Sequence, residues 1–290
     1  MMLKDQHLFC FGLGYCANVL SNQLKQVGWK VSGTSQSENS SPTIHMFTGD
    51  QPMVLESDAL AGISHILISI PPGTDQDPTL EWHKTDILKL KSLQWVGYLS
   101  TTGVYGNTDG EWVDETSTTN PTSPRSQSRL NAETEWLNLF HENDVPVHVF
   151  RLPGIYGPGR SALDQVQKGR ARRIDKPGHK FSRIHVADIA NTITQSMACP
   201  NPGRIYNVCD NEAAPPAEVT AYACKLLDVP VPNTVPYEIA AQDMSPMALS
   251  FWQDNRRVDN TRITSELSVQ LKYPTYRDGL KAIFDMETET

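Results

Sequence analysis

The sequence is poor in the features that mark secreted, metal-bound and membrane-spanning proteins. Its five cysteines are an odd number without Cys-x-x-Cys or Cys/His ligand spacing, so neither a disulfide framework nor a metal site is predicted. The N-terminus lacks the order of charged, apolar and small residues typical of a signal peptide, and no apolar run approaches membrane-spanning length. We therefore expect a cytoplasmic protein with no membrane partner, whose cysteines are small buried side chains.

The chain also lacks an excess of positive charge. Its formal net charge of −8 disfavours nucleic acid or an anionic membrane as partner, because such surfaces require a basic footprint. Arg170, Arg172 and Arg173 form a local basic group, which we interpret as a solvated face. A small-molecule substrate is the partner class that remains. A length of 290 residues allows one large α/β domain with a smaller one appended.

Short apolar runs alternate with amphipathic segments, which is typical of βαβ units and a doubly wound parallel sheet. Helices are predicted after the first run, after Asp77-Pro78, over 125–142 and over 217–227, and a late strand over 204–208. Residues 1–157 are predicted to form a Rossmann-type domain that parts of 180–210 complete, and 158–290 mainly a substrate-binding lobe. The strands are predicted at residues 7–11, 29–33, 65–70, 95–100 and 147–151.

A glycine-rich turn follows the first predicted strand directly. The segment reads Gly12-Leu13-Gly14-Tyr15-Cys16-Ala17. Its first glycine permits a tight turn, its second lets a pyrophosphate approach the backbone, and Ala17 allows close helix packing. The helix N-terminus then offers N–H groups and a favourable dipole to phosphates. Because strand, turn and helix occur together, we favour NAD or NADP binding over the alternative of a purely structural turn.

The end of the second predicted strand favours NADP slightly over NAD. NAD binders carry an acid there, about 20 residues after the turn, that holds the ribose hydroxyls. This chain has Thr34, Ser35 and Gln36 instead, and Glu38 comes slightly later. An acid repels a 2′-phosphate, whereas hydroxyl and amide groups accept one. No arginine stands at this position to pair with that phosphate.

Further segments resemble the extended short-chain dehydrogenase/reductase superfamily, of the NAD-dependent epimerase/dehydratase type. Residues 99–106 read Leu-Ser-Thr-Thr-Gly-Val-Tyr-Gly, residues 151–159 contain Arg-Leu-Pro-Gly-Ile-Tyr-Gly, and residues 184–190 contain Ile-His-Val-Ala-Asp. These resemble three motifs of that superfamily in the right order, over about residues 7–210. The resemblance implies cofactor contacts at Gly12, Leu13, Gly14, Tyr15, Ala17, Thr34, Ser35, Gln36, Ile70, Pro71, Pro72, Ser100, Arg129 and Pro153, and substrate contacts at Tyr156, Arg183 and His185.

The catalytic pair of that superfamily has no counterpart here. A Tyr-x-x-x-Lys pair begins the helix after the Val-Tyr-Gly loop in the family, and the alignment without gaps places Arg125 and Arg129 at those positions. Arginine has a pKa above about 12 and does not exchange protons near neutral pH. We therefore expect standard tyrosine-dependent turnover to be absent or slight. Arg129 retains donors for ribose hydroxyls, and Arg125 is either a partner for an anionic substrate group or a surface residue.

Other acid–base candidates are each open to a structural alternative. Thr101, at the position of the family's catalytic Ser or Thr, either binds a substrate oxygen or caps a strand end. Tyr105 and Tyr156 are structural or substrate-contacting residues more often than acids in the family. His185 has an ordinary pKa near neutrality, but its motif mainly joins the lobes.

Two main functions are thus compatible with the sequence. The first is an NAD(P)-dependent oxidoreductase or epimerase acting on a nucleotide-sugar-like or other polar metabolite, and the alternative is a catalytically silent dinucleotide-binding sensor or regulator. A structural subunit without nucleotide is disfavoured by the intact turn. The resemblance also implies a homodimer contact through the helix over 125–142 and the neighbouring helix after Asp77. Trp82, Trp136 and Phe140 suit such a contact, although burial against the sheet explains them equally well.

Overall fold

A computed structural model describes residues 6–37, 41–53, 60, 62–74 and 76–289 of the chain. It divides into two compact units, each assembled from separate stretches of sequence. The first unit comprises the chain up to Thr101 together with Pro124–Arg151 and Ile189–Tyr206. The second comprises Thr102–Ser123, Leu152–Asp188 and Asn207–Thr290.

The first unit contains a 7-stranded sheet in the order β11-β7-β5-β4-β1-β2-β3. The pairs β1–β2, β1–β4, β2–β3 and β4–β5 are parallel, with Leu8 opposite Val31 on one side and His65 on the other. A parallel sheet whose order reverses beside β1 is the doubly wound arrangement that binds ligands at its carboxyl edge. The strands are β1 (His7–Phe11), β2 (Lys30–Ser35), β3 (Ile44–Met46), β4 (His65–Ile68), β5 (Trp95–Thr101), β7 (Val147–Leu152) and β11 (Ile205–Asn207).

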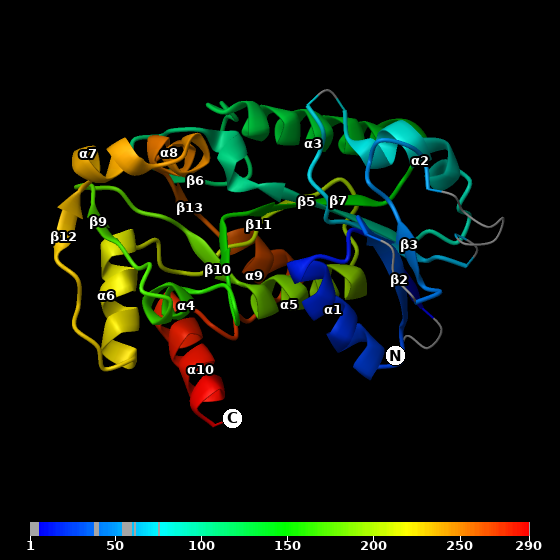
Figure 1. Cartoon of the computed structure of the whole chain (residues 1–290). Helices are drawn as coiled ribbons and strands as arrows, with labels where there is room; N and C mark the ends of the chain where they lie inside the picture. Colours follow the sequence, from blue (N-terminus) through cyan, green and yellow to red (C-terminus); the bar gives the residue numbers. More distant parts are fainter. Residues whose placement is uncertain (1–5, 38–40, 54–59, 61, 75, 290) are drawn as a thin grey trace. The chain divides into compact units, whose positions relative to one another are not determined.

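Helices cover both faces of this sheet. In Figure 1, α2 (Pro78–Leu88) and α3 (Pro124–Asn143) lie on one face, and α1 (Tyr15–Gln26) and α5 (Val186–Ala198) lie on the other. The Asp77 side chain accepts the Thr79 and Leu80 N–H groups at 2.9 and 3.3 Å, and Pro78 occupies the first helical position of α2. The helix start predicted at Asp77-Pro78 is therefore present.

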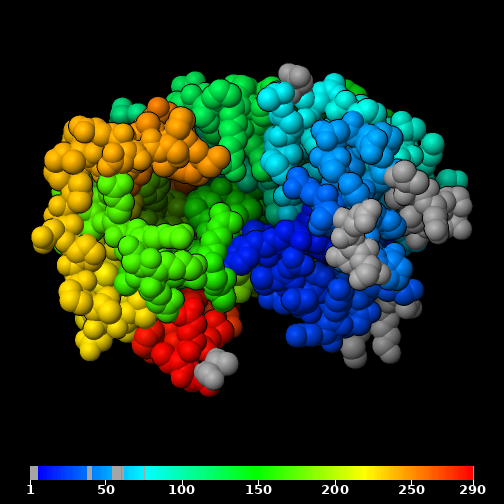
Figure 2. Space-filling model, in the orientation of Figure 1, coloured from blue at the N-terminus to red at the C-terminus, as the bar shows by residue number. Residues whose placement is uncertain are grey.

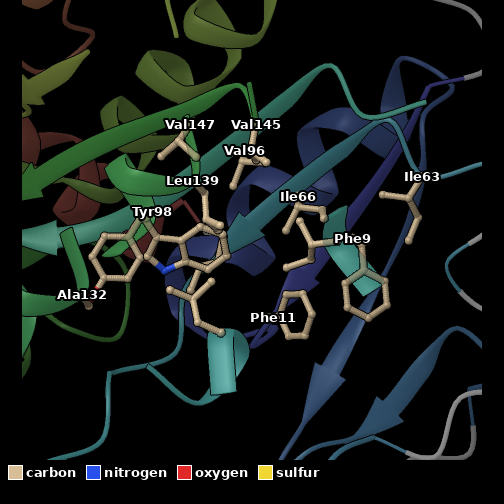
Figure 3. Packing of buried hydrophobic residues seen from close by; sticks show 14 of the residues in the cluster. Phe9, Phe11, Ile63, Ile66, Val96, Tyr98, Ala132, Leu139, Val145 and Val147 are labelled. Atoms are coloured by element: carbon tan, nitrogen blue, oxygen red, sulfur yellow. The ribbon is translucent and has the colours of Figure 1, made fainter. Parts of the chain in front are cut away.

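The main core of the first unit lies between the sheet and the α2–α3 layer. Phe9, Phe11, Ile66 and Tyr98 of the strands are fully buried there, and Trp136 of α3 stacks on Tyr98 with ring centroids 6.3 Å apart. In Figure 3, Tyr98 lies beside Ala132 and Leu139, and Phe9, Phe11 and Ile66 lie together in another part of the same cluster. Trp136 is thus part of the chain's own core and is not accessible to a partner. A homodimer contact through other residues remains a prediction.

The second unit is built from short paired strands and helices. Its pairs β8–β10, β9–β12 and β6–β13 are parallel. The strands are β6 (Trp112–Val113), β8 (Gly154–Tyr156), β9 (Arg173–Asp175), β10 (Arg183–His185), β12 (Thr234–Pro236) and β13 (Arg257–Val258). The helices are η1 (Thr102–Tyr105), α4 (Ala162–Gln167), α6 (Pro216–Leu226), α7 (Tyr237–Ala240), η2 (Ala241–Asp243), α8 (Pro246–Gln253), α9 (Thr261–Leu267) and α10 (Tyr276–Thr288).

Two clusters hold the second unit together. Apolar residues of α4, α6 and α10 surround Tyr156 and Tyr276, and a smaller cluster around Trp252 joins α7 and α8 to β9. Figure 2 shows α7 and α8, in orange, at the surface of this unit. Ile239, Met247 and Phe251 are exposed on them.

The predicted fold class, an α/β Rossmann-type sheet, is confirmed, and the predicted strands and helices are present with ends shifted by one or two residues. The short edge strand β3 was not predicted, because three residues are too few to show an alternation of apolar and polar side chains. Cys199 is exposed, which corrects the expectation that all cysteines are buried. Among the described residues, no helix combines the length and apolar character of a membrane span. The naming of a nucleotide domain and a substrate lobe stays a prediction.

Candidate functional site

The turn after β1 is fixed to the end of β2 through its backbone. Gly12 has a φ of +90°, and a Cβ added there would lie 2.6 Å from Ile70 Cγ2, so the position requires glycine. The Gly12 N–H donates to Thr34 Oγ1 at 2.8 Å, and the Leu13 N–H donates to the Thr34 carbonyl at 2.8 Å. The turn is therefore built before any ligand arrives.

Gly14 differs from Gly12, because nothing in the chain itself requires a glycine there. It is the N-cap of α1 in an extended conformation, with φ −86° and ψ −164°, that any residue adopts. A Cβ added to Gly14 meets no atom within 4 Å. The missing side chain leaves space directly at the N-terminus of α1, where the helix dipole favours an anion. Ala17, one turn later, is fully buried, as close helix packing requires.

The three predicted ribose-binding residues at the end of β2 differ from one another in how exposed their side chains are. Thr34 is 1% exposed and its hydroxyl is the acceptor for Gly12, so this side chain holds the turn. Ser35 is half-buried and Gln36 is exposed, which leaves these two side chains accessible. Glu38 lies outside the described residues. Beside them, at the end of β4, the Ile70 N–H donates to the Phe11 carbonyl at 3.2 Å, and Pro71 is exposed.

Successive residues at the carboxyl end of β5 are hydrogen-bonded to α3. The Arg129 guanidinium donates to the Leu99 carbonyl, and the Ser100 hydroxyl donates to Glu133, one helical turn further along. Glu133 forms a buried ion pair with Arg151 of β7, with Nη2 and Oε2 2.7 Å apart. These contacts lock α3 on the sheet in one register. Thr101, half-buried, ends β5, and Arg125 is exposed in the first turn of α3.

Residues predicted to contact substrate come together in the second unit. The pairing of β8 with β10 sets Tyr156 opposite His185 and Gly154 opposite Arg183. Arg183 donates to the carbonyls of Phe181 and Ala214 at 2.7 and 3.0 Å. The Tyr156 hydroxyl donates to the Thr275 carbonyl at 3.4 Å, and burial raises the pKa of this phenol well above its ordinary value.

His185 is buried between the rings of Tyr156 and Tyr273, whose centroids lie 5.2 and 4.2 Å away. Its Nδ1 accepts the Ala187 N–H at 3.1 Å. Burial, aided by the charge of Lys272, lowers the pKa of His185 to about 4. The imidazole is therefore neutral near pH 7 and does not titrate there, unlike a histidine in water.

Tyr105 is also engaged. It is 1% exposed, and its hydroxyl donates to Asn207 Oδ1 at 2.7 Å. The Asn207 N–H in turn donates to Glu115 at 2.7 Å. The hydroxyl of Tyr105 thus already belongs to a buried hydrogen-bond network of the second unit.

Sequence reasoning missed the buried acids. Asp210, in the second unit after β11, is 3% exposed, and burial raises its pKa to about 7 against the opposing effects of the Glu212 N–H and the Arg183 charge. Asp210 therefore changes charge near neutral pH, which His185 does not. No pattern marked it. For Glu133 a signal existed, because it falls on the apolar face of its helix beside Trp136, and a buried acid needs a cation.

Comparisons with known proteins relate the chain to one family and to one relative of similar length. Residues 85–209 match the model of the NAD dependent epimerase/dehydratase family. The chain is 26% identical over 285 residues to Protein YeeZ of Escherichia coli (strain K12), covering 91% of this chain and 94% of that protein.

Solved structures extend the likeness over nearly the whole chain. A functionally unknown conserved protein from Silicibacter pomeroyi DSS is 45% identical, with a TM-score of 0.87 and coverage of 98% of this chain and 100% of that one. The dTDP-glucose 4,6-dehydratase of Bacillus anthracis str. Ames, solved in complex with NAD, shares the fold at 19% identity. Its TM-score is 0.74, with 98% of this chain and 97% of that chain covered.

Proposed function

Because this chain belongs to the NAD-dependent epimerase/dehydratase family, of the extended short-chain dehydrogenase/reductase type, we propose that it binds a nicotinamide dinucleotide at residues 12–17. In this proposal it acts on a nucleotide-sugar-like or other polar metabolite. The family match does not favour the regulatory alternative. Among the described residues no cluster of His, Cys, Asp or Glu is arranged to hold a metal ion, and the proposal invokes none.

The observation that carries the proposal is the space at Gly14. A glycine that the backbone conformation does not need, with nothing within 4 Å of its absent side chain, is what close approach of a pyrophosphate requires. The fixed turn and the dipole of α1 supply attraction to the phosphates. The residues of the first unit therefore fit the cofactor.

Other first-unit residues would hold the remaining parts of the cofactor. Ser35 and Gln36 would receive the adenosine ribose, and their neutral hydroxyl and amide groups accept a 2′-phosphate, so NADP is preferred over NAD. Ile70, Pro71 and Pro72 would provide an apolar surface against which the cofactor packs. Ser100, Thr101 and Arg129 would face the nicotinamide end, where the cofactor supplies hydride chemistry when bound. Pro153 of the second unit remains a predicted contact.

For the proton that must accompany hydride transfer, the chain lacks the usual tyrosine. The Tyr105 hydroxyl is already hydrogen-bonded to Asn207, and burial raises the pKa of Tyr156 well above its ordinary value. We therefore expect little reductase turnover of the standard kind, and we assign Arg125 to an anionic group of the substrate.

Titration of NADPH and NADH fluorescence with the full-length protein tests the binding proposal. We expect both to bind, NADPH more tightly, and Gly14→Val to weaken NADPH binding by about tenfold or more. Gly14→Val should retain the wild-type melting temperature, because the added side chain meets nothing in the chain. Gln23→Val, on the exposed face of α1, is the matched control. The proposal is overturned if neither nucleotide binds, or if Gly14→Val binds like wild type.

A further inference from the structure

Leu13, the residue between the two glycines of the phosphate turn, is fixed to the end of β2. Its N–H donates to the Thr34 carbonyl at 2.8 Å. Its side chain lies against Gly33, where an added Cβ would be 3.0 Å from Leu13 Cγ and would collide with the Cys10 carbonyl oxygen. The turn therefore approaches β2 this closely because residue 33 has no side chain.

The carbonyl of the same residue is bonded to helix α1. The Asn18 side chain donates to the Leu13 carbonyl through Nδ2 at 2.8 Å, and the Asn18 N–H donates to the Gly14 carbonyl, also at 2.8 Å. Asn18 is exposed, so the bond from its side chain lies at the surface of the first unit. The two backbone polar groups of Leu13 are thus both engaged, the N–H by β2 and the carbonyl by α1.

The direction of the Leu13 carbonyl determines the direction of the next N–H. The peptide bond between Leu13 and Gly14 is trans, and the C=O and N–H groups of a trans peptide point in opposite directions. Because Asn18 holds the Leu13 carbonyl towards α1, the Gly14 N–H points away from α1, as the N–H groups of a first helical turn do. No described residue accepts a hydrogen bond from the Gly14 N–H. This donor lies beside the space that the missing Gly14 side chain leaves.

We propose that Asn18 is a positioning residue, whose side-chain amide fixes the Leu13–Gly14 peptide so that the Gly14 N–H can donate to a phosphate of the nicotinamide dinucleotide. This inference rests on the proposed function. Glycine has more backbone freedom than any other residue, so an unrestrained Gly14 would lose much entropy when it contacts a phosphate. Asn18 orders the peptide before a ligand arrives, and binding is then stronger because this loss is smaller.

Asn18→Leu removes the side-chain donor and keeps a side chain of similar size. Leucine favours a helix more than asparagine does, so the melting temperature should stay close to that of wild type. We expect NADP⁺ affinity, measured by calorimetry, to fall about three- to tenfold, the effect of losing one hydrogen bond. Asn18→Ala, which also lacks a donor, should behave alike. Asn22→Leu makes the same substitution one turn further along α1, at an exposed position, and should leave the affinity unchanged.

Backbone amide exchange in the nucleotide-free protein distinguishes positioning from a direct contact between Asn18 and the nucleotide. Positioning predicts that the Leu13 N–H, bonded to the Thr34 carbonyl, exchanges about three- to tenfold faster in Asn18→Leu than in wild type or Asn22→Leu. Wild-type affinity in Asn18→Leu, or weaker binding with an unchanged exchange rate, would overturn the positioning role. If the wild-type protein binds no nucleotide, the proposed function itself fails, whereas the exchange rates still show whether Asn18 holds the turn.

Discussion

The N–H of Gly12 donates to the hydroxyl of Thr34 at 2.8 Å, across the gap between the first two strands of the sheet. The residue at the tip of β2 therefore shapes the phosphate turn, while its neighbours Ser35 and Gln36 face outward. Within the segment 34–36, Thr34 therefore stabilises the turn, whereas Ser35 and Gln36 are accessible to a ligand.

Thr34→Val should destabilise the first unit. Valine keeps the shape of threonine but leaves the Gly12 N–H without an acceptor, which costs about 1–3 kcal/mol of unfolding free energy. Urea denaturation measures the change, and NADPH affinity should fall with it. Thr34→Ser keeps the hydroxyl and should retain most of the stability. A valine variant as stable as wild type would show that the turn does not depend on this bond.

Gln36→Glu should reverse the nucleotide preference. An acid near the ribose repels a 2′-phosphate, so NADPH affinity should fall about tenfold, whereas NADH affinity should hold or rise. Fluorescence titration of both nucleotides gives the ratio directly. Gln23→Glu adds the same charge on the exposed face of α1 and serves as the control. An equal loss for both nucleotides would mean that position 36 does not face the adenosine ribose.

Gly279→Ala should destabilise the second unit, contrary to the usual effect of this change in a helix. Alanine normally stabilises a helix interior by about 0.5–1 kcal/mol relative to glycine. A Cβ at position 279 of α10, however, would lie 2.1 Å from the Tyr156 hydroxyl oxygen. We expect a net loss of about 1–3 kcal/mol in thermal or chemical denaturation, because the core must shift.

The control for this change is Gly154→Ala, because a Cβ added at Gly154 makes only ordinary van der Waals contacts. Gly169→Ala is unsuitable, because Gly169 has a positive φ that strains any other residue. Gly154→Ala should therefore change stability little. Combining Gly279→Ala with Tyr156→Leu, which removes the ring, should restore part of the loss. Stabilisation by Gly279→Ala alone would contradict the packing of Tyr156 against α10.

His185 should make the protein less stable in acid. Its pKa in the folded protein is about 4, below its ordinary value of 6.5, so the unfolded chain takes up the proton first as pH falls. The contribution of a neutral His185 is complete above pH 6.5 and is lost between pH 6.5 and about 4. The loss amounts to about 1.4 kcal/mol per pH unit within that window.

The measurement compares wild type with His185→Phe by chemical denaturation at several pH values. The variant loses the acceptor for the Ala187 N–H at every pH, so this cost is a constant offset. The difference in unfolding free energy should shift in favour of the variant as the pH falls from 6.5 to 4. The exposed His141→Phe is the control. A difference independent of pH would mean that His185 is not buried as a neutral ring.

The sequence by itself determined the local architecture and the phosphate turn. Apolar runs of strand length alternating with amphipathic segments leave few alternatives to a parallel sheet, and His7–Phe11 runs into Gly12 with its boundaries as predicted. Asp77-Pro78 marks the start of α2 for an equally local reason, since the cap and the proline act within one turn. The identity of residues 125 and 129 is likewise a property of the sequence alone.

Only the tertiary structure decided what the polar side chains do. Thr34 is a turn-holding residue because β1 and β2 lie side by side, which no spacing along the chain reveals. The pKa values of His185 and Asp210 depart from their ordinary values because of burial, which depends on what packs around each group. The electrostatics of a site follow from distances and solvent exclusion, and these exist only once the chain has folded.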